Sequence, residues 1–256
     1  MAQPLFYLLQ VIGIALLLLF VFLPYNTFGE DIKMVKDQGF VLIKLLAIIL
    51  ALWTAGTSIA DEIEGRTALT LLSKPVGRHE FVFGKFFGVL LPVAILFLVL
   101  GAVFLMTVSY KVVFDAREMA QLPPSWHDCW REVVQTIPGL MLAFMETILM
   151  TSISVAIAMR LPILPNLIIC LSIYILGHLL PVLPNTAVGQ FEIVGFFARL
   201  FSTIFPVLDH YNIEPAIATG QKVPLPYLGW AGLHTLLYCS FAMLAALLMF
   251  EDRDLA

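Results

Sequence analysis

Charged residues are scarce in this chain of 256 residues. Asp, Glu, Lys and Arg make up 12% of the sequence, whereas a soluble domain averages about 25%. Hydrophobic residues make up 61%, and the mean hydropathy is +0.96. A water-soluble protein of this length could not cover so much apolar surface. The composition therefore excludes a soluble domain and predicts a polytopic membrane protein embedded in the lipid bilayer.

The sequence also lacks the motifs of several functional classes. It has no G-x-x-x-x-G-K-[ST] segment, so the chain cannot bind and hydrolyse ATP as a P-loop protein does. G-x-S-x-G, H-E-x-x-H and paired C-x-x-C motifs are absent, and the missing nucleophile–base pair argues against an intramembrane enzyme. No basic tract points to nucleic acid. We therefore expect a protein that is not an enzyme and binds no nucleic acid.

Two other features bear on metals and disulfides. The three cysteines, Cys129, Cys170 and Cys239, are scattered and odd in number, which argues against a disulfide framework. His127 and Asp128 precede Cys129 directly. Three ligand types so close together on one loop are more often coincidence than a site. We expect no metal site in this chain.

Six segments are long and apolar enough to cross a membrane, which takes about 20 mostly apolar residues for roughly 30 Å of hydrocarbon. They lie at about 5–23, 40–60, 86–109, 137–159, 164–183 and 227–250. The first has neither a basic n-region nor a small-x-small cleavage site, so we expect a retained helix and not a signal peptide. The prediction is an all-α fold with six transmembrane helices in a single transmembrane domain, residues 1–256.

Two segments outside these spans are unusual. Residues 61–85 form a charged, amphipathic island between two apolar segments, as is typical of a helix at the membrane surface. Glu62 and Arg66 stand four residues apart with the acid first, the stabilising order on a helix. Residues of about 188–212 are too apolar for a free loop, yet charges and Pro206 interrupt a span. We expect external helices there that enter the outer leaflet and turn back.

The island carries a motif at fixed spacing. It reads roughly E-x-E-x-x-T, then Leu-Leu-Ser-x-Pro-Val-x-Arg, then Glu and Gly-Lys. The matching residues are Glu62, Glu64, Thr67, Leu71, Leu72, Ser73, Pro75, Val76, Arg78, Glu80, Gly84 and Lys85. It resembles the loop between the second and third transmembrane helices of ABC-2 type transporter permeases, the transmembrane subunits of ATP-driven exporters. The end of the chain is similar to the family's ending, and the subgroup it resembles is that of permeases linked to copper-enzyme maturation.

This resemblance implies a function and partners. The loop 61–85 would be a cytoplasmic coupling loop whose interfacial coupling helix docks on a separate ABC ATPase subunit. The residues expected at that interface are Glu62, Glu64, Arg66, Thr67, Leu69, Leu72, Pro75 and Arg78. The chain would work as a dimer with a second copy or a paralogue, in the inner or plasma membrane with both termini cytoplasmic. ATP and Mg²⁺ would bind the partner ATPase, so this chain itself would hold no cofactor while an unidentified substrate is exported.

Three ionisable residues fall inside the expected spans. Glu146 lies roughly 13 Å deep at 1.5 Å per residue, and His178 and His234 fall at a comparable depth in the outer half. A charge in hydrocarbon costs at least a few kcal/mol unless it is paired or hydrated. Either separate neighbours satisfy the three, or they line a shared substrate path.

Those three residues also allow an alternative function. The chain could be an ion- or proton-coupled secondary transporter or channel that uses Glu146, His178 and His234 as a relay. Such transporters are often built from internal repeats. The two halves of this sequence show no such repeat.

Overall fold

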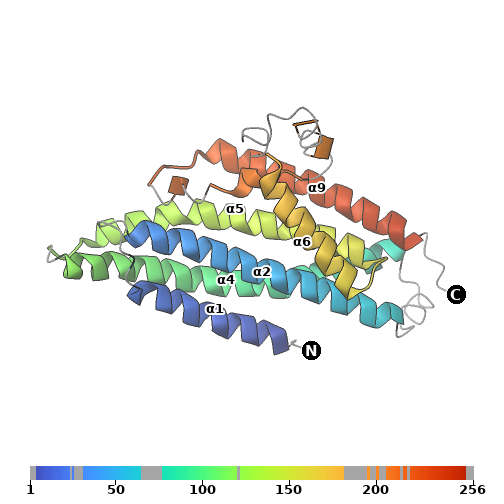
Figure 1. Cartoon of the computed structure of the whole chain (residues 1–256), viewed down its shortest axis with the longest axis horizontal. Helices are drawn as coiled ribbons and strands as arrows, with labels where there is room; N and C mark the ends of the chain where they lie inside the picture. The colour runs from blue at the N-terminus through green and yellow to red at the C-terminus, as the bar shows by residue number, and fades with distance from the viewer. Residues whose placement is uncertain are drawn as a thin grey trace. The chain divides into compact units, whose positions relative to one another are not determined.

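The computed structural model describes residues 4–23, 25, 31–64, 77–119, 122–181, 195–196, 200–201, 206–213, 216–217 and 220–251, with backbone only for 60–64, 78 and 251. Most of these residues are helical, and none of them belongs to a strand. The helices are α1 (Pro4–Phe22), α2 (Asp31–Glu64), α4 (Arg78–Glu118), α5 (Trp126–Ala158), α6 (Ile163–Leu179) and α9 (Leu225–Glu251), with a short 3₁₀ helix, η3 (Leu208–Tyr211) (Figure 1). The prediction of an all-α fold is confirmed.

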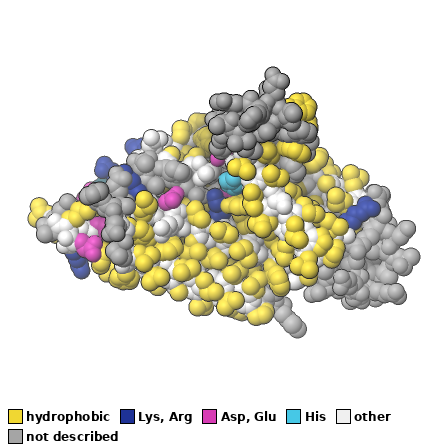
Figure 2. Space-filling view, in the orientation of Figure 1, with side chains coloured by type: hydrophobic (Ala, Val, Ile, Leu, Met, Phe, Trp, Pro, Cys, Tyr) yellow, Lys and Arg dark blue, Asp and Glu magenta, His cyan; other side chains and the backbone are white. Residues whose placement is uncertain are grey.

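Five of these helices, α1, α2, α4, α5 and α9, are long and apolar enough to cross a membrane. The sixth apolar helix, α6, is shorter at 17 residues. Hydrophobic side chains dominate the face seen in Figure 2, and large ones such as Leu98 on α4 and Phe241 on α9 are exposed. Lipid, not water, is the solvent that tolerates such a surface. The chain is a multi-pass membrane protein, as the composition predicts.

Several helices continue beyond the spans expected from hydropathy. α2, α4 and α5 have 34, 41 and 33 residues, more than the roughly 20 residues that cross the hydrocarbon. The apolar runs 40–60 and 86–109 are thus the middle parts of longer helices, and 137–159 corresponds to the C-terminal part of α5. Charged residues near the ends of these helices, such as Lys36 and Lys111, belong to helical turns and not to loops.

Two expected features fall partly outside the described residues. Of the coupling loop 61–85, residues 61–64 belong to α2 and 78–85 to α4, whereas 65–76 are not among the described residues. Of the external helices at about 188–212, the structure describes η3 and a few neighbouring residues. The coupling helix and the re-entrant helices stay predictions.

The chain divides into two compact units, and α2, α4, α5 and α9 each contribute to both. Unit 1 comprises Met1–Leu50, Leu91–Thr147 and Ile213–Gly232. Within it, α1 packs closely on α2 and α4 at Gly13, where a Cβ atom would lie 2.9 Å from Leu46 and 2.8 Å from Leu100. Small residues at such crossings let helix backbones approach each other in a membrane. α1 therefore packs closely against both α2 and α4.

Unit 2 comprises Ala51–Leu90, Ile148–Asn212 and Leu233–Ala256. Its apolar core joins the end of α2, the start of α4 and the ends of α5 and α9, and includes a stacked ring pair, Phe81 and Phe250, with centroids 5.1 Å apart. α6 is fastened to α5 by a buried hydrogen bond from Asn166 Nδ2 to Ser154 Oγ at 3.0 Å. Such interhelical bonds contribute roughly 0.6 kcal/mol on average in membrane proteins.

Gly39 of α2 offers a test of the packing in unit 1. A Cβ atom there would lie 2.0 Å from Phe104 Cε2 of α4. Gly39→Ala should therefore lower the free energy of unfolding in detergent by about 1–3 kcal/mol through overpacking. Gly88→Ala, where a Cβ meets no atom within 4 Å, is the matched control and should be neutral or stabilising. Equal stability of the two variants would contradict the close approach of α2 and α4.

Candidate functional site

Three lysines of unit 1 are almost completely buried. Lys36 is 1% exposed, Lys44 4% and Lys111 1%. Lysine is rarely buried to this extent unless it is paired. Each of the three has a carboxylate partner on another helix: Lys36 contacts Glu132 of α5, Lys44 contacts Glu146 of α5, and Lys111 contacts Asp31 of α2. Ion pairs thus join α2 to both α4 and α5.

The Lys44–Glu146 pair lies within the apolar runs of both helices. Lys44 Nζ is 3.3 Å from Glu146 Oε2, and the glutamate side chain is fully buried. An isolated charge at this position would cost several kcal/mol, and an opposite charge within contact distance offsets that cost. Sequence reasoning identified Glu146 but missed Lys44. The signal was present, because Lys44 stands between Ile43 and Leu45 inside the expected span 40–60.

Lys111 of α4 contacts residues at or near the ends of α1 and α2. Its ammonium lies 2.9 Å from Asp115 Oδ1 on the same helix and 3.5 Å from Asp31 Oδ2 at the start of α2. It also donates to the Val21 carbonyl, near the end of α1, at 3.3 Å. A cation is favourable beside the unpaired carbonyls at a helix C-terminus. One buried ammonium therefore connects α1, α2 and α4.

Tyr25 lies beside this cluster, with the Lys111 ammonium 5.8 Å from its ring centroid. Burial, and then the negative charge of Asp31, raise the pKa of the Tyr25 hydroxyl. The phenol therefore stays protonated and donates a hydrogen bond to Gln38 Oε1 at 2.9 Å.

Carboxylates of Asp31, Asp115 and Glu118 lie close enough together to hold a metal ion. However, the Lys111 ammonium contacts Asp31 and Asp115. This side chain therefore already supplies a positive charge to two of the three carboxylates. The other possible metal ligands noted in the sequence, His127, Asp128 and Cys129, differ in exposure. Cys129 is buried, whereas His127 and Asp128 are exposed.

The two predicted histidines belong to unit 2 and have partners of their own. His234 Nδ1 lies 2.9 Å from the hydroxyl of Tyr211 in η3, and the same hydroxyl lies 2.7 Å from Thr235 Oγ1. His178 Nδ1 lies 3.1 Å from the Tyr174 carbonyl one turn earlier in α6. His234 thereby connects α9 to η3. A shared polar lining of the substrate path by Glu146, His178 and His234 stays a prediction.

The expected coupling interface falls on residues that the structure describes in part. Arg66, Thr67, Leu69, Leu72 and Pro75 lie outside the described residues, as do the side chains of Glu62, Glu64 and Arg78. The helix ends on either side are described.

Hydrogen bonds join the end of α2 to the start of α4. Lys85 Nζ of α4 donates to both the carbonyl and the hydroxyl of Ser58 in α2, at 2.9 Å each. The Gly77 amide donates to Glu80 Oε2 at 3.1 Å, closing the start of α4. The assignment of the segment between them to ATPase docking stays a prediction.

The helices and their buried ion pairs define an integral membrane protein whose helical core holds polar groups away from lipid. A family model described as ABC-2 family transporter protein matches residues 14–255, which is nearly the whole chain. The chain belongs to this family of ABC transporter permeases, and the family inferred from the loop motif is confirmed. A comparison with curated proteins gives no match. The subgroup linked to copper-enzyme maturation stays a prediction.

The Lys44–Glu146 pair can be tested by a double-mutant cycle. Lys44→Met leaves the buried carboxylate without its ammonium and should lower the free energy of unfolding by about 3–5 kcal/mol. Adding Glu146→Met should restore most of this loss, because an apolar pair of similar volume replaces a buried ion pair at little cost. Lys222→Met, at an exposed lysine, controls for the substitution itself. Additive losses in the double variant would contradict the pairing.

Proposed function

We propose that this chain is the permease subunit of an exporter in which ATP hydrolysis on a separate ATPase subunit drives substrate across the membrane. The family match over residues 14–255 supports this proposal most strongly. The chain itself has no P-loop sequence, so the energy of ATP must come from another subunit. ABC-2 permeases generally pair with an ABC ATPase and often act as dimers. We extend both properties to this chain, with a second copy or a paralogue as its partner.

The construction of unit 2 supports a role for the loop 61–85 in energy coupling. The loop joins α2 to α4, and the Lys85–Ser58 hydrogen bonds fasten these helices close to where it begins and ends. Behind them, Ile59, Phe81 and Phe250 belong to one buried apolar core. Packed cores resist continuous deformation and shift between discrete arrangements. A push on the loop by the ATPase would therefore move the surrounding helix ends together.

A gradient-driven transporter is the second candidate, because Glu146 and His234 are ionisable groups within helices that can span the membrane. The position of Lys44 beside Glu146 argues for a structural ion pair over a free relay carboxylate. The two candidates differ in their energy source. Permease reconstituted without an ATPase would transport under an ion gradient only if the second candidate were right.

The docking role of the loop leads to a test with two substitutions. Glu62→Ala with Arg66→Ala removes the paired charges expected to contact the ATPase. Loss of about 1.4 kcal/mol of binding free energy would weaken ATPase association about tenfold. We expect weaker co-purification and ATPase activity that no longer responds to the permease, with unchanged membrane insertion.

The matched control is Arg117→Ala with Glu118→Ala, two exposed charges at the opposite end of α4. This control should associate normally. A Glu62/Arg66 variant with full association and full coupling would show that the loop is not the docking site.

The proposed orientation, with both termini cytoplasmic, can be tested by labelling. Arg117, Arg160 and Lys222 are exposed in the structure, so single cysteines at these positions should react. In a background without Cys129, an impermeant thiol reagent should label positions 117 and 222 in intact cells and position 160 only after lysis. Labelling of position 160 in intact cells would invert the topology.

A further inference from the structure

The first half of α5 carries a row of exposed apolar side chains in unit 1. They follow one another at spacings of four, four, three and four residues, which places them on one face of a helix. The side chains are between 36% and 81% exposed. We call this row the α5 stripe, and its members are Trp126, Trp130, Val134, Ile137 and Met141.

The opposite face of α5 packs on α2. Glu132 pairs there with Lys36 of α2, and a Cβ atom at Gly139 would lie 2.6 Å from Phe40 of the same helix. Glu132 and Gly139 lie about half a turn around the helix from the stripe, at roughly 3.6 residues per turn. α5 is therefore held in unit 1 by one face and leaves the stripe exposed on the other.

The stripe begins in water and ends in lipid. The apolar run of α5 starts near residue 137, so Ile137 and Met141 lie at the depth of the hydrocarbon. Trp126 lies about 16 Å farther out than Ile137, at roughly 1.5 Å per residue. The headgroup layer on one side of a bilayer is only about 5–8 Å thick. Lipid can therefore cover the inner end of the stripe but not its outer end.

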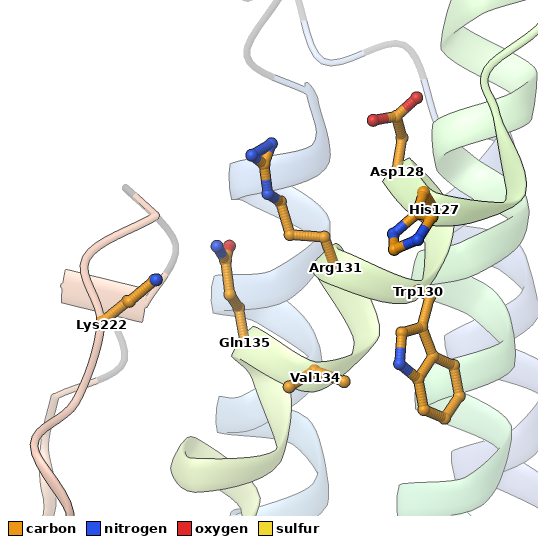
Figure 3. Close-up of a pocket in the computed structure, with 7 residues that line it drawn as sticks. All are labelled: His127, Asp128, Trp130, Arg131, Val134, Gln135 and Lys222. Carbon is orange, nitrogen blue, oxygen red and sulfur yellow. The ribbon is translucent and has the colours of Figure 1, made fainter.

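Two hollows lie beside the outer half of the stripe. One, of about 400 Å³, is lined by Trp126, His127 and Trp130. The other, of about 520 Å³, borders Trp130 and Val134, and its polar lining residues are His127, Asp128, Arg131, Gln135 and Lys222. In Figure 3 the Gln135 side chain lies on the side of Lys222, whereas the Trp130 ring points in another direction. An apolar stripe with hollows beside it and a polar border has the make-up of a helix–helix interface.

We propose that the α5 stripe binds the α5 stripe of a second copy of this chain. This inference rests on the proposed function, in which the permease works as a pair. The occupant has to cover an apolar surface in water and its continuation in lipid. A lipid cannot do the first, and a water-soluble protein cannot do the second.

A second copy meets both conditions. Two copies inserted in the same orientation are related by a two-fold axis along the membrane normal, and such an axis brings the same patch of both subunits together. The water-exposed and lipid-exposed ends of the two stripes then lie at equal depths. The tryptophans of each copy pack into the hollows beside those of the other.

The first test is disulfide cross-linking of the full chain by an oxidant in native membranes. Val134→Cys places a thiol in the middle of the stripe, and we expect a product of twice the chain mass on a non-reducing gel. The matched control is Tyr110→Cys on α4, an exposed position of unit 1 at a similar depth. It should give no more product than the parent chain, which retains Cys129, Cys170 and Cys239.

The second test measures the Kd of the pair in a mild neutral detergent, from energy transfer between labelled copies on dilution. Trp126→Ala with Trp130→Ala should raise this Kd at least tenfold, because tryptophans at the centre of an interface carry much of the binding energy. The matched control is Trp53→Ala with Trp230→Ala, which removes the other two tryptophans of the chain, also exposed. It should leave the Kd unchanged.

Three results would overturn the proposal. A Tyr110→Cys product without a Val134→Cys product would mean that the copies meet through another face. A Val134→Cys product of a different mass would mean that another membrane protein covers the stripe. Equal Kd values for the two tryptophan variants would mean that the stripe does not bind the second copy.

Co-purification of an ATPase from the same samples separates this inference from the proposed function. An ATPase that elutes with a chain whose stripe does not cross-link overturns the stripe and leaves the proposed function standing. A chain that cross-links through the stripe but elutes without an ATPase supports the stripe and contradicts the proposed function.

Discussion

A lysine buried among membrane helices needs a carboxylate beside it, and this requirement determines how the first unit is built. α2 carries Lys36 and Lys44, and both are paired with glutamates of α5. The start of α2 also supplies Asp31 to Lys111 of α4. In lipid, apolar contacts between helices have little directional preference, since the acyl chains are as apolar as leucine. The ion pairs and the close contacts at Gly13 and Gly39 therefore fix the register of the helices.

The polar contacts described in unit 2 are of a different kind. Lys85 donates to Ser58, Asn166 donates to Ser154, and Tyr211 shares hydrogen bonds with His234 and Thr235. Interhelical hydrogen bonds in membranes contribute roughly 0.6 kcal/mol on average, whereas breaking a buried ion pair costs about 3–5 kcal/mol. Each of these described hydrogen bonds is thus easier to break than an ion pair of unit 1. Unit 2 also holds the helix ends next to the loop 61–85, where an ATPase would act under the proposed function.

Hydropathy and motif spacing predicted the all-helical membrane fold and the transporter family. They failed where side-chain pairing depends on how helices face each other. Lys44 and Glu146 are far apart in the sequence, and depth along a helix says nothing about the direction in which a side chain points. Depth alone left open whether Glu146 shares a lining with His178 and His234, and Lys44 was missed. The pocket of Arg131 and Lys222 was missed for the same reason, because tertiary packing alone brings the two segments together.

The helix bounds show a related limit. A hydropathy window ends where charges begin. However, α2 extends beyond its apolar run toward its N-terminus, through Lys36 to Asp31, and α4 extends toward its C-terminus through Lys111 and Asp115. The lysines in these charged turns are paired with carboxylates of neighbouring helices in the unit. Only the partners on neighbouring helices reveal this, and the sequence alone does not specify them.

The central claim is that this permease depends on a separate ATPase. Purification of the intact chain from its native membrane in mild detergents, with mass spectrometry of the co-eluting proteins, tests it most directly. We expect one P-loop ATPase to elute with the permease in a constant, near-equal molar amount. A monodisperse permease that elutes without any ATPase in several mild detergents would contradict the claim.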